Sequence, residues 1–205
     1  PRAGSTLLQL MITSCVEGVK TFAKEHNALP CAMNAWRNHT YMMTKRPNDI
    51  FRVDEVRDYY ADKSANVRFL LTLRDPRDVL VSQHSNRPGQ SYVDFSRWND
   101  IYQCFQDLSG DHDVRVVRFE ELVTNPNKVQ HELTQFMDWT TVRPFSEYAE
   151  GDLSRQKTTA LNGLRPPDSS AIARWRNPKH YARLRECLSE MPQLPQLLID
   201  LDYES

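Results

Sequence analysis

The first residues of the chain combine a small, flexible residue with hydroxyl and cationic side chains. The segment PRAGSTLL (residues 1–8) places glycine beside two hydroxyl residues where a helix is predicted to begin. Backbone N–H groups at a helix start, together with the positive end of its dipole, favour an anionic ligand. Arg2 and the hydroxyls of Ser5 and Thr6 can add hydrogen bonds to such an anion. Taken alone, the octamer also fits an ordinary helix cap, since Ser and Thr are common cap residues.

This octamer differs from the two most familiar nucleotide-binding patterns. It lacks the GK[ST] ending of a Walker A loop and therefore its phosphate-binding lysine. No G-x-G-x-x-G fingerprint of a dinucleotide site is present either. The predicted ligand is an anionic group, and its identity depends on the rest of the chain.

A second set of polar residues follows the most apolar segment. Arg74 comes directly after Val67–Leu73, a near-continuous apolar run that predicts a strand buried on both faces. Ligands bind at the carboxyl ends of such strands in open α/β sheets. Asp75 can cap a helix that we expect over Pro76–His84. Ser82 then lies two helical turns into that helix, close enough for Arg74 and Ser82 to hold one phosphate.

The alternative interpretation of this segment is an ordinary helix start with charges in solvent. In that case Asp75 is the cap, and the side chains of Arg77 and Asp78 are solvated.

The elements that must position these residues alternate between strand-like and helical segments. This pattern predicts an α/β fold with a parallel sheet of about four or five strands and helices on both faces. Val114–Phe119 is the second clear strand, and Val19–Lys24 and Thr40–Met43 are weaker candidates. The segments 87–90 and 163–168 are rich in Pro and Gly and are predicted loops.

Two further helices are predicted from caps and apolar spacing. Asn125 precedes Pro126 and Asn177 precedes Pro178, and both pairs favour helix starts. Each helix carries an apolar stripe that we expect in the core, namely Val129, Leu133, Phe136 and Met137 in the first and Tyr181, Leu184, Leu188 and Met191 in the second.

Composition narrows the function classes. The 205 residues suit one domain over residues 1–205, and 40% hydrophobic with 26% charged residues is typical of a globular chain. The net charge of −1 argues against bulk attraction to nucleic acid. No apolar run approaches the roughly 20 residues of a membrane span. The four cysteines form no CxxC or Cys/His pattern, so we expect no metal site and reduced thiols in a cytoplasmic protein.

Taken together, the two anion-binding segments resemble the sulfotransferase family, which uses 3′-phosphoadenosine 5′-phosphosulfate (PAPS). Residues 1–6 are similar to its 5′-phosphosulfate loop (PRSGTT or PKSGTT), although Ser5 replaces a frequent Thr. Residues 74–82 are similar to its 3′-phosphate motif, and VRFEEL (117–122) with Asn125-Pro126 is similar to RYEDL…NP, with Phe119 in place of Tyr. The segment SSAIARWR (169–176) is similar to a late S-x-x-R-W segment.

The resemblance implies a P-loop-like three-layer sandwich with a central parallel sheet. It also implies a strand before the phosphate loop, so we expect that one precedes Pro1 in the whole protein. Arg165 is a further candidate ligand from the late segment, and Trp175 is either a core residue or a wall of the nucleotide site. The residues that the resemblance assigns to the nucleotide are Arg2, Ala3, Gly4, Ser5, Thr6, Arg74, Ser82, Ser170 and Arg174.

The implied reaction is in-line transfer of a sulfuryl group to a hydroxyl, without a metal and with adenosine 3′,5′-bisphosphate as product. Lys45, in MTKRP (43–47), resembles the K-x-P of related members, where the lysine stabilises the leaving oxygen. Arg2 shares that charge neutralisation. The general base remains open: Glu25 is the first candidate, and the alternatives are Glu17, His39 and His84.

The acceptor hydroxyl belongs to a small metabolite, a saccharide, a lipid or a peptide. Two alternatives stay open, a P-loop kinase-like nucleotide enzyme and a non-catalytic nucleotide-binding module of the same fold. We expect the cytoplasm as location, or the Golgi lumen if the chain is an excised catalytic domain.

Overall fold

The strands form short pairs in the part of the chain that the structure describes. The computed structural model describes residues 2–22, 25–29, 41–84, 87–151 and 166–204. β1 (Val19–Thr21) pairs in parallel with β2 (Tyr41–Met43), and β3 (Phe69–Leu73) pairs in parallel with β6 (Val114–Arg118). The mixed α/β class is therefore confirmed. Instead of one sheet of four or five strands, the described residues contain two separate parallel pairs.

The observed strands are shorter than their apolar runs. Val67 and Arg68 precede β3, because pairing begins only where the Phe69 N–H donates to the carbonyl of Asp113. Phe119 is no longer part of β6 and instead begins a helix. β3 is half-buried along its whole length, so its predicted burial on both faces is wrong. Within the described residues β3 has only β6 as a neighbour.

The third pair replaces two predicted features. β4 (Gln83–His84) and β5 (Arg87–Ser91) form an antiparallel hairpin, so residues 87–90 are a strand and not a loop. The helix expected over Pro76–His84 ends at Leu80, because the chain beyond it turns into this hairpin. The Tyr92 N–H donates to the Ser82 carbonyl at 2.9 Å, which holds Ser82 outside the helix.

The helices vary widely in length, and several short 3-10 turns separate them. The α-helices are α1 (Ser5–Cys15), α2 (Val53–Tyr60), α3 (Pro76–Leu80), α4 (Phe95–Leu108), α5 (Phe119–Thr124), α6 (Pro126–Met137), α8 (Tyr181–Glu190) and α9 (Leu194–Asp200). The 3-10 helices are η2 (Pro47–Arg52), η3 (Phe145–Glu150), η5 (Ser169–Ala171), η6 (Arg174–Arg176) and η7 (Pro178–His180).

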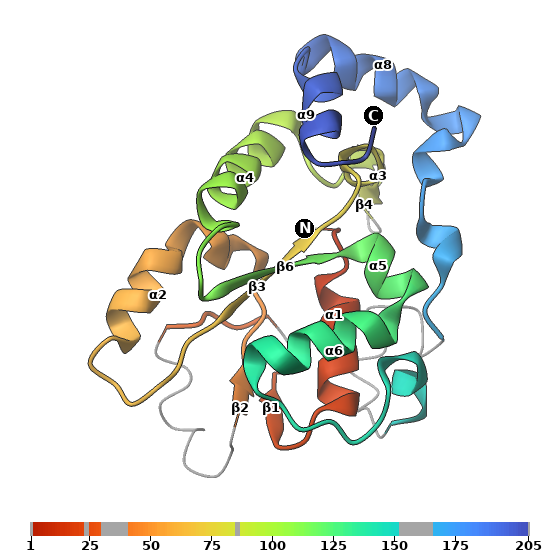
Figure 1. Cartoon of the computed structure of the whole chain (residues 1–205). Helices are drawn as coiled ribbons and strands as arrows, with labels where there is room; N and C mark the ends of the chain where they lie inside the picture. Colours follow the sequence, from red (N-terminus) through yellow and green to blue (C-terminus); the bar gives the residue numbers. More distant parts are fainter. Residues whose placement is uncertain (1, 23–24, 30–40, 85–86, 152–165, 205) are drawn as a thin grey trace.

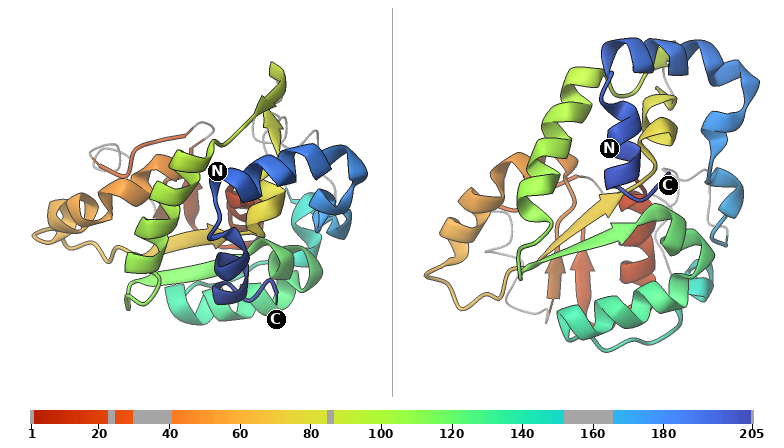
Figure 2. Two further views of the ribbon diagram at one scale, coloured as in Figure 1. Left: turned by 90° about the horizontal axis from the view of Figure 1, so that it is seen from above. Right: turned by 45° about the horizontal axis from the view of Figure 1, so that its top comes forward.

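The β3–β6 pair lies in the middle of the molecule, with α4 on one side and α5 and α6 on the other (Figures 1 and 2). One buried cluster joins α1, α5, α6 and η3, with Leu10, Met11, Ile12 and Phe145 at most 1% exposed. A second joins α3, α4, α8 and α9 around Leu80, Cys187 and Leu194. The amino terminus lies beside the end of β3 (Figure 1).

The predicted caps hold only in part. The Asp75 carboxylate accepts the Arg77 N–H at 2.9 Å and caps α3 as expected. Asn125 stands at the start of α6, but its amide donates to the Thr124 hydroxyl and does not cap the helix. The apolar face of α6 does pack as predicted, with Val129 and Leu133 in the first core cluster.

The apolar stripe of α8 is mostly outside the core, which corrects the prediction. Tyr181 and Leu188 are 49% and 48% exposed, and Leu184 is half-buried. The core side of the helix is instead formed by Cys187, and by Met191 just beyond its end. The stripe at i, i+3 and i+7 is therefore a surface feature in the described structure.

Candidate functional site

The end of β3 and the start of α1 meet at one place. Arg74 directly follows β3, where Leu73 pairs with Arg118 of β6. Its guanidinium Nη1 donates to the Arg2 carbonyl at 3.2 Å, although the two residues are 72 positions apart. The structure thus brings the two predicted anion-binding segments into contact.

The loop before α1, which is the predicted phosphate loop, adopts a backbone that depends on Gly4. Gly4 is the N-cap of α1 with φ 90°, and Arg2 has φ 65°. A Cβ at Gly4 would lie 2.6 Å from Cδ2 of Phe119, too close for any other residue without a shift. Ser5 and Thr6 occupy the first turn, and no side chain caps the helix. The alternative of an ordinary Ser/Thr cap is therefore not what the structure shows.

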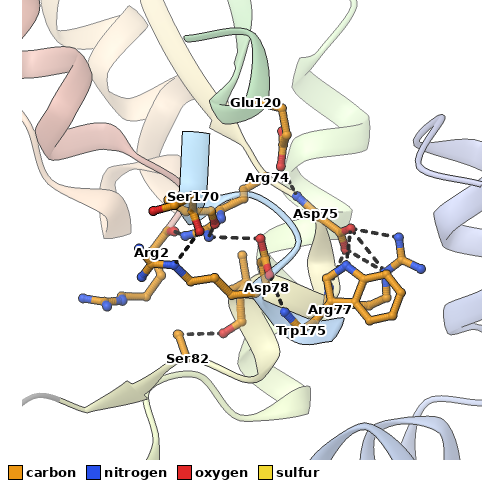
Figure 3. A network of polar contacts seen from close by, with 12 residues as sticks. Arg2, Arg74, Asp75, Arg77, Asp78, Ser82, Glu120, Ser170 and Trp175 are labelled. Atoms are coloured by element: carbon orange, nitrogen blue, oxygen red, sulfur yellow. Dashed lines mark hydrogen bonds and ion pairs between the residues drawn. The ribbon is translucent and has the colours of Figure 1, made fainter. Parts of the chain in front are cut away.

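The Arg74 side chain is fixed by three segments of the chain (Figure 3). Besides the Arg2 carbonyl, its Nη2 donates to Asp78 Oδ2 at 3.0 Å and to the Ala171 carbonyl at 2.5 Å. The guanidinium lies over the Phe119 ring at 4.4 Å, and the side chain is only 11% exposed. Its Nε is buried and has no hydrogen-bond partner among the described residues.

Ser82 does not share these contacts. Its Oγ donates to the Val79 carbonyl at 2.7 Å, at the end of α3. No hydrogen bond between Ser82 and Arg74 occurs in the described structure. The expected placement of Ser82 two turns into a helix is wrong, because α3 ends at Leu80. Its role toward a phosphate stays a prediction.

The late segment lies against the turn that follows β3. Ser170 and Arg174 are exposed, and the Arg174 Nε donates to the Ser170 carbonyl at 3.4 Å. The Ala171 contact with Arg74 brings this segment to the site. Trp175 is half-buried and outside the core clusters of the described residues. Of its two interpretations, the core residue is therefore wrong, and the wall of a nucleotide site stays a prediction. Arg165 lies outside the described residues.

Lys45 contacts one residue predicted for catalysis, Glu25, and one predicted for the nucleotide, Thr6. Its Nζ lies 3.1 Å from Thr6 Oγ1 and 3.2 Å from Glu25 Oε1. The Lys45 side chain is 18% exposed, whereas that of Glu25 is 54% exposed. The backbone of His26 donates to the Lys45 carbonyl at 3.3 Å, which joins the two segments. A cation, a hydroxyl and a carboxylate therefore meet at the start of α1.

The other candidate bases differ in position. Glu17 follows the carboxyl end of α1, and the 11 residues of that helix separate it from the phosphate loop by about 15 Å. His84 stacks on Tyr92 at 5.2 Å, and the Arg2 guanidinium lies 5.4 Å above the same ring. Tyr92 thus contacts both His84 and Arg2 of the loop. His39 lies outside the described residues.

Sequence reasoning missed several residues that organise the site. The Phe119 ring lies against both Gly4 and the Arg74 guanidinium. The only sequence feature that pointed to Phe119 was its presence where the sulfotransferase pattern has Tyr. The Glu120 carboxylate accepts the Asp75 N–H at 3.0 Å and the Tyr203 hydroxyl at 3.0 Å. Burial and the nearby Glu120 raise the pKa of the Tyr203 hydroxyl well above its ordinary value. Nothing in the local sequence around Tyr203 indicates this contact.

Three cations lie around the first turn of α1, and two of them pair with carboxylates, Lys45 with Glu25 and Arg74 with Asp78. Arg2, Lys45 and Arg74 supply positive charge, and the open first turn of α1 supplies N–H donors. Among the residues that the structure describes, no group of three or more His, Cys, Asp or Glu could hold a metal ion. In the same residues, no helix has the length and apolar character needed to cross a bilayer.

Comparison with known proteins adds no assignment. No protein-family model matches the chain, and no curated protein matches it significantly.

Proposed function

We propose that this chain is a sulfotransferase that moves a sulfuryl group from PAPS to an acceptor hydroxyl. The observation that supports the proposal most directly is the position of Lys45 Nζ, 3.1 Å from Thr6 Oγ1 and 3.2 Å from Glu25 Oε1 at the start of α1. This arrangement supports the proposal because a cation at a helix N-terminus suits an anionic group, and a nearby carboxylate suits the proton of a hydroxyl.

The residues fit the two anionic ends of the donor. The α1 N–H groups, Arg2 and Lys45 suit the phosphosulfate, and Arg74 with Ser170 and Arg174 suits a 3′-phosphate. In this proposal β1, β2, β3 and β6 belong to a P-loop-like three-layer sandwich. We place the reaction in the cytoplasm, where the described thiols of Cys15, Cys104 and Cys187 would stay reduced.

The proposed chemistry is a single displacement. The acceptor oxygen forms a bond to sulfur while the bond from sulfur to the bridging oxygen breaks, and that oxygen keeps the electron pair. Glu25 accepts the proton of the acceptor hydroxyl. Lys45 stabilises the negative charge that develops on the leaving oxygen, which becomes part of adenosine 3′,5′-bisphosphate.

A ligand comparison tests the nucleotide. A ligand that binds the folded state raises the midpoint of thermal unfolding. We expect adenosine 3′,5′-bisphosphate to raise it more than adenosine 5′-phosphate or ATP with Mg²⁺ does. A larger shift with ATP and Mg²⁺ would instead favour a kinase-like enzyme and overturn the proposal.

A lysine variant tests catalysis. The charge of Lys45 matters more in the transition state than in the bound donor, so Lys45→Ala should lower turnover about 10²-fold or more. Binding of adenosine 3′,5′-bisphosphate should weaken much less. Lys20→Ala is the matched control, since Lys20 is exposed on β1. Equal turnover by both variants would contradict the catalytic role.

A further inference from the structure

Trp175 attaches the late segment to the turn after β3 through both of its N–H groups. Its backbone N–H donates to Asp78 Oδ1 at 2.9 Å, and its indole Nε1 donates to Asp75 Oδ2 at 3.1 Å. The two carboxylates are buried, with 0% of the Asp78 side chain and 9% of the Asp75 side chain exposed. Figure 3 shows the indole beside Asp75 and Arg77.

Each of these aspartates also pairs with an arginine of the same turn. Asp78 binds Arg74 at 3.0 Å, and Asp75 binds Arg77 at 2.8 Å. The Arg77 guanidinium lies 3.9 Å above the Trp175 ring. Phenylalanine could keep the ring over Arg77 but has no N–H for Asp75. The face of the indole therefore contacts Arg77, and the N–H at its edge binds Asp75.

Trp175 lies close in the chain to Ala171, which contacts the Arg74 guanidinium. Only a short stretch separates Trp175 from Ala171, whose carbonyl accepts from Arg74 Nη2 at 2.5 Å. Within that stretch Ala173 has φ 54°, a left-handed conformation that is costly for alanine and persists only when its surroundings hold it. Because Trp175 anchors the segment on the far side of Ala173, we expect that loss of its indole contacts loosens the contact of the Ala171 carbonyl with Arg74.

We propose that Trp175 is a positioning residue that sets the selectivity of the site for a 3′-phosphorylated nucleotide. It acts through Asp75 and Asp78, which fix η5 and η6 against Arg74 and so hold the guanidinium in one orientation. This inference rests on the proposed function, because it assumes that Arg74 binds the 3′-phosphate.

The test compares two affinities in the full chain. Isothermal titration calorimetry gives Kd for adenosine 3′,5′-bisphosphate and for adenosine 5′-phosphate, and their ratio measures selectivity. Trp175→Ala should reduce this ratio about tenfold, the effect of weakening one charge-assisted contact. Trp175→Phe should reduce it about threefold, since it loses the bond to Asp75 but keeps a ring over Arg77, whereas Trp175→Ala loses both. Both variants should bind adenosine 5′-phosphate nearly as well as the wild type does.

Trp139→Phe is the matched control for a purely structural effect. Trp139 is 7% exposed and packs in the first core cluster, where its ring contacts Tyr41. This variant should lower the thermal midpoint and leave the affinity ratio unchanged.

The outcomes separate the two proposals. If the wild type does not prefer the 3′-phosphorylated nucleotide, the proposed function fails, and this inference with it. If the wild type has that preference and both Trp175 variants retain it, only the positioning role is overturned. If Trp175→Ala does not fold, the affinity ratio of Trp175→Phe alone decides whether the positioning role stands.

Discussion

Lys45 and Glu25 form an ion pair of unequal exposure. The lysine is mostly buried and is held by Thr6, whereas the carboxylate lies mostly in solvent, where an acceptor can reach it. In the proposed reaction, the base must meet its proton within hydrogen-bond distance, and the exposed Glu25 carboxylate satisfies this requirement. The proposal therefore gives separate tasks to two adjacent side chains.

Replacement of Glu25 by Gln tests the base. The amide keeps the shape but accepts no proton, so Glu25→Gln should lower turnover about 10²-fold or more and leave nucleotide binding nearly unchanged. Turnover is measured with PAPS and a verified acceptor. Glu17→Gln, at the other end of α1, is the control and should be fully active. If Glu25→Gln is active and His39→Ala is not, the base is a histidine. If both are active, the proposed proton transfer is wrong.

A substitution of Gly4 tests how a single residue contributes to stability. Gly4→Ala combines a left-handed backbone with a Cβ 2.6 Å from the Phe119 ring, so it should cost about 1–3 kcal/mol in the free energy of unfolding. Urea denaturation measures it. Gly110→Ala is the control, because a Cβ at Gly110 meets nothing within 4 Å. Equal stability of the two variants would show that the loop adapts without strain.

At the scale of elements, α2 is joined to the start of β6 by one arginine. Arg57 Nη2 lies 2.6 Å from Asp113 Oδ1 and 2.7 Å from Asp111 Oδ2, and its guanidinium lies 5.6 Å from the Phe69 ring centroid. The hydrogen bond from Arg57 holds the pKa of Asp113 below its ordinary value. The ionised carboxylate is therefore the form that the folded state favours.

This contact predicts an acid-dependent loss of stability. The folded-state pKa of Asp113 is lowered, so its ionised carboxylate contributes to the free energy of unfolding. This contribution is fully present above the unfolded pKa of about 3.9 and is lost as the pH falls further. Arg57→Met should cost about 1–2 kcal/mol at pH 6, and the difference from wild type should shrink below about pH 4. Urea denaturation at several pH values measures both.

The control for this effect is Arg52→Met, which removes an exposed ion pair with Glu55 and should change stability little. A difference between wild type and Arg57→Met that is constant from pH 6 to pH 3 would exclude the Asp113 carboxylate as its source.

The elements also show which structural features can be predicted from the local sequence. The Asp75 cap, the strand before Arg74 and the apolar face of α6 depend on neighbouring residues and were predictable. The end of α3 was not, because it depends on the pairing of β4 with β5. The exposed stripe of α8 has the spacing of a core face, and only the tertiary arrangement decides which side of the helix is covered.

At the scale of the whole molecule, the site depends on contacts between distant segments. The sequence predicted that Arg2, Lys45 and Arg74 share one site, and the structure places the loop at both Lys45 and Arg74. It did not predict that buried carboxylates at Asp75 and Asp78 hold the late segment. In the sequence these residues fit solvated charges equally well, since a partner 97 or 100 positions away leaves no local pattern.

The carboxyl-terminal contact gives a prediction at this scale. Tyr203→Phe removes the hydroxyl that donates to Glu120, so it should lower the free energy of unfolding by about 1 kcal/mol. Urea denaturation measures the loss, with Tyr181→Phe as control because the Tyr181 side chain is exposed. Equal stability of Tyr203→Phe and wild type would show that water replaces the lost donor at Glu120.

The contacts around Arg74 also determine when the site can form. Arg74 and Ala171 are 97 positions apart, and Arg77 and Glu204 are 127 positions apart. Closing such long loops costs conformational entropy before the contact contributes favourable energy, so we expect these contacts to form late in folding. During synthesis, the turn after β3 leaves the ribosome before about a hundred further residues have been added. A nascent chain that already contains every residue of the predicted phosphate loop and of this turn therefore still lacks the arrangement that we propose selects the nucleotide.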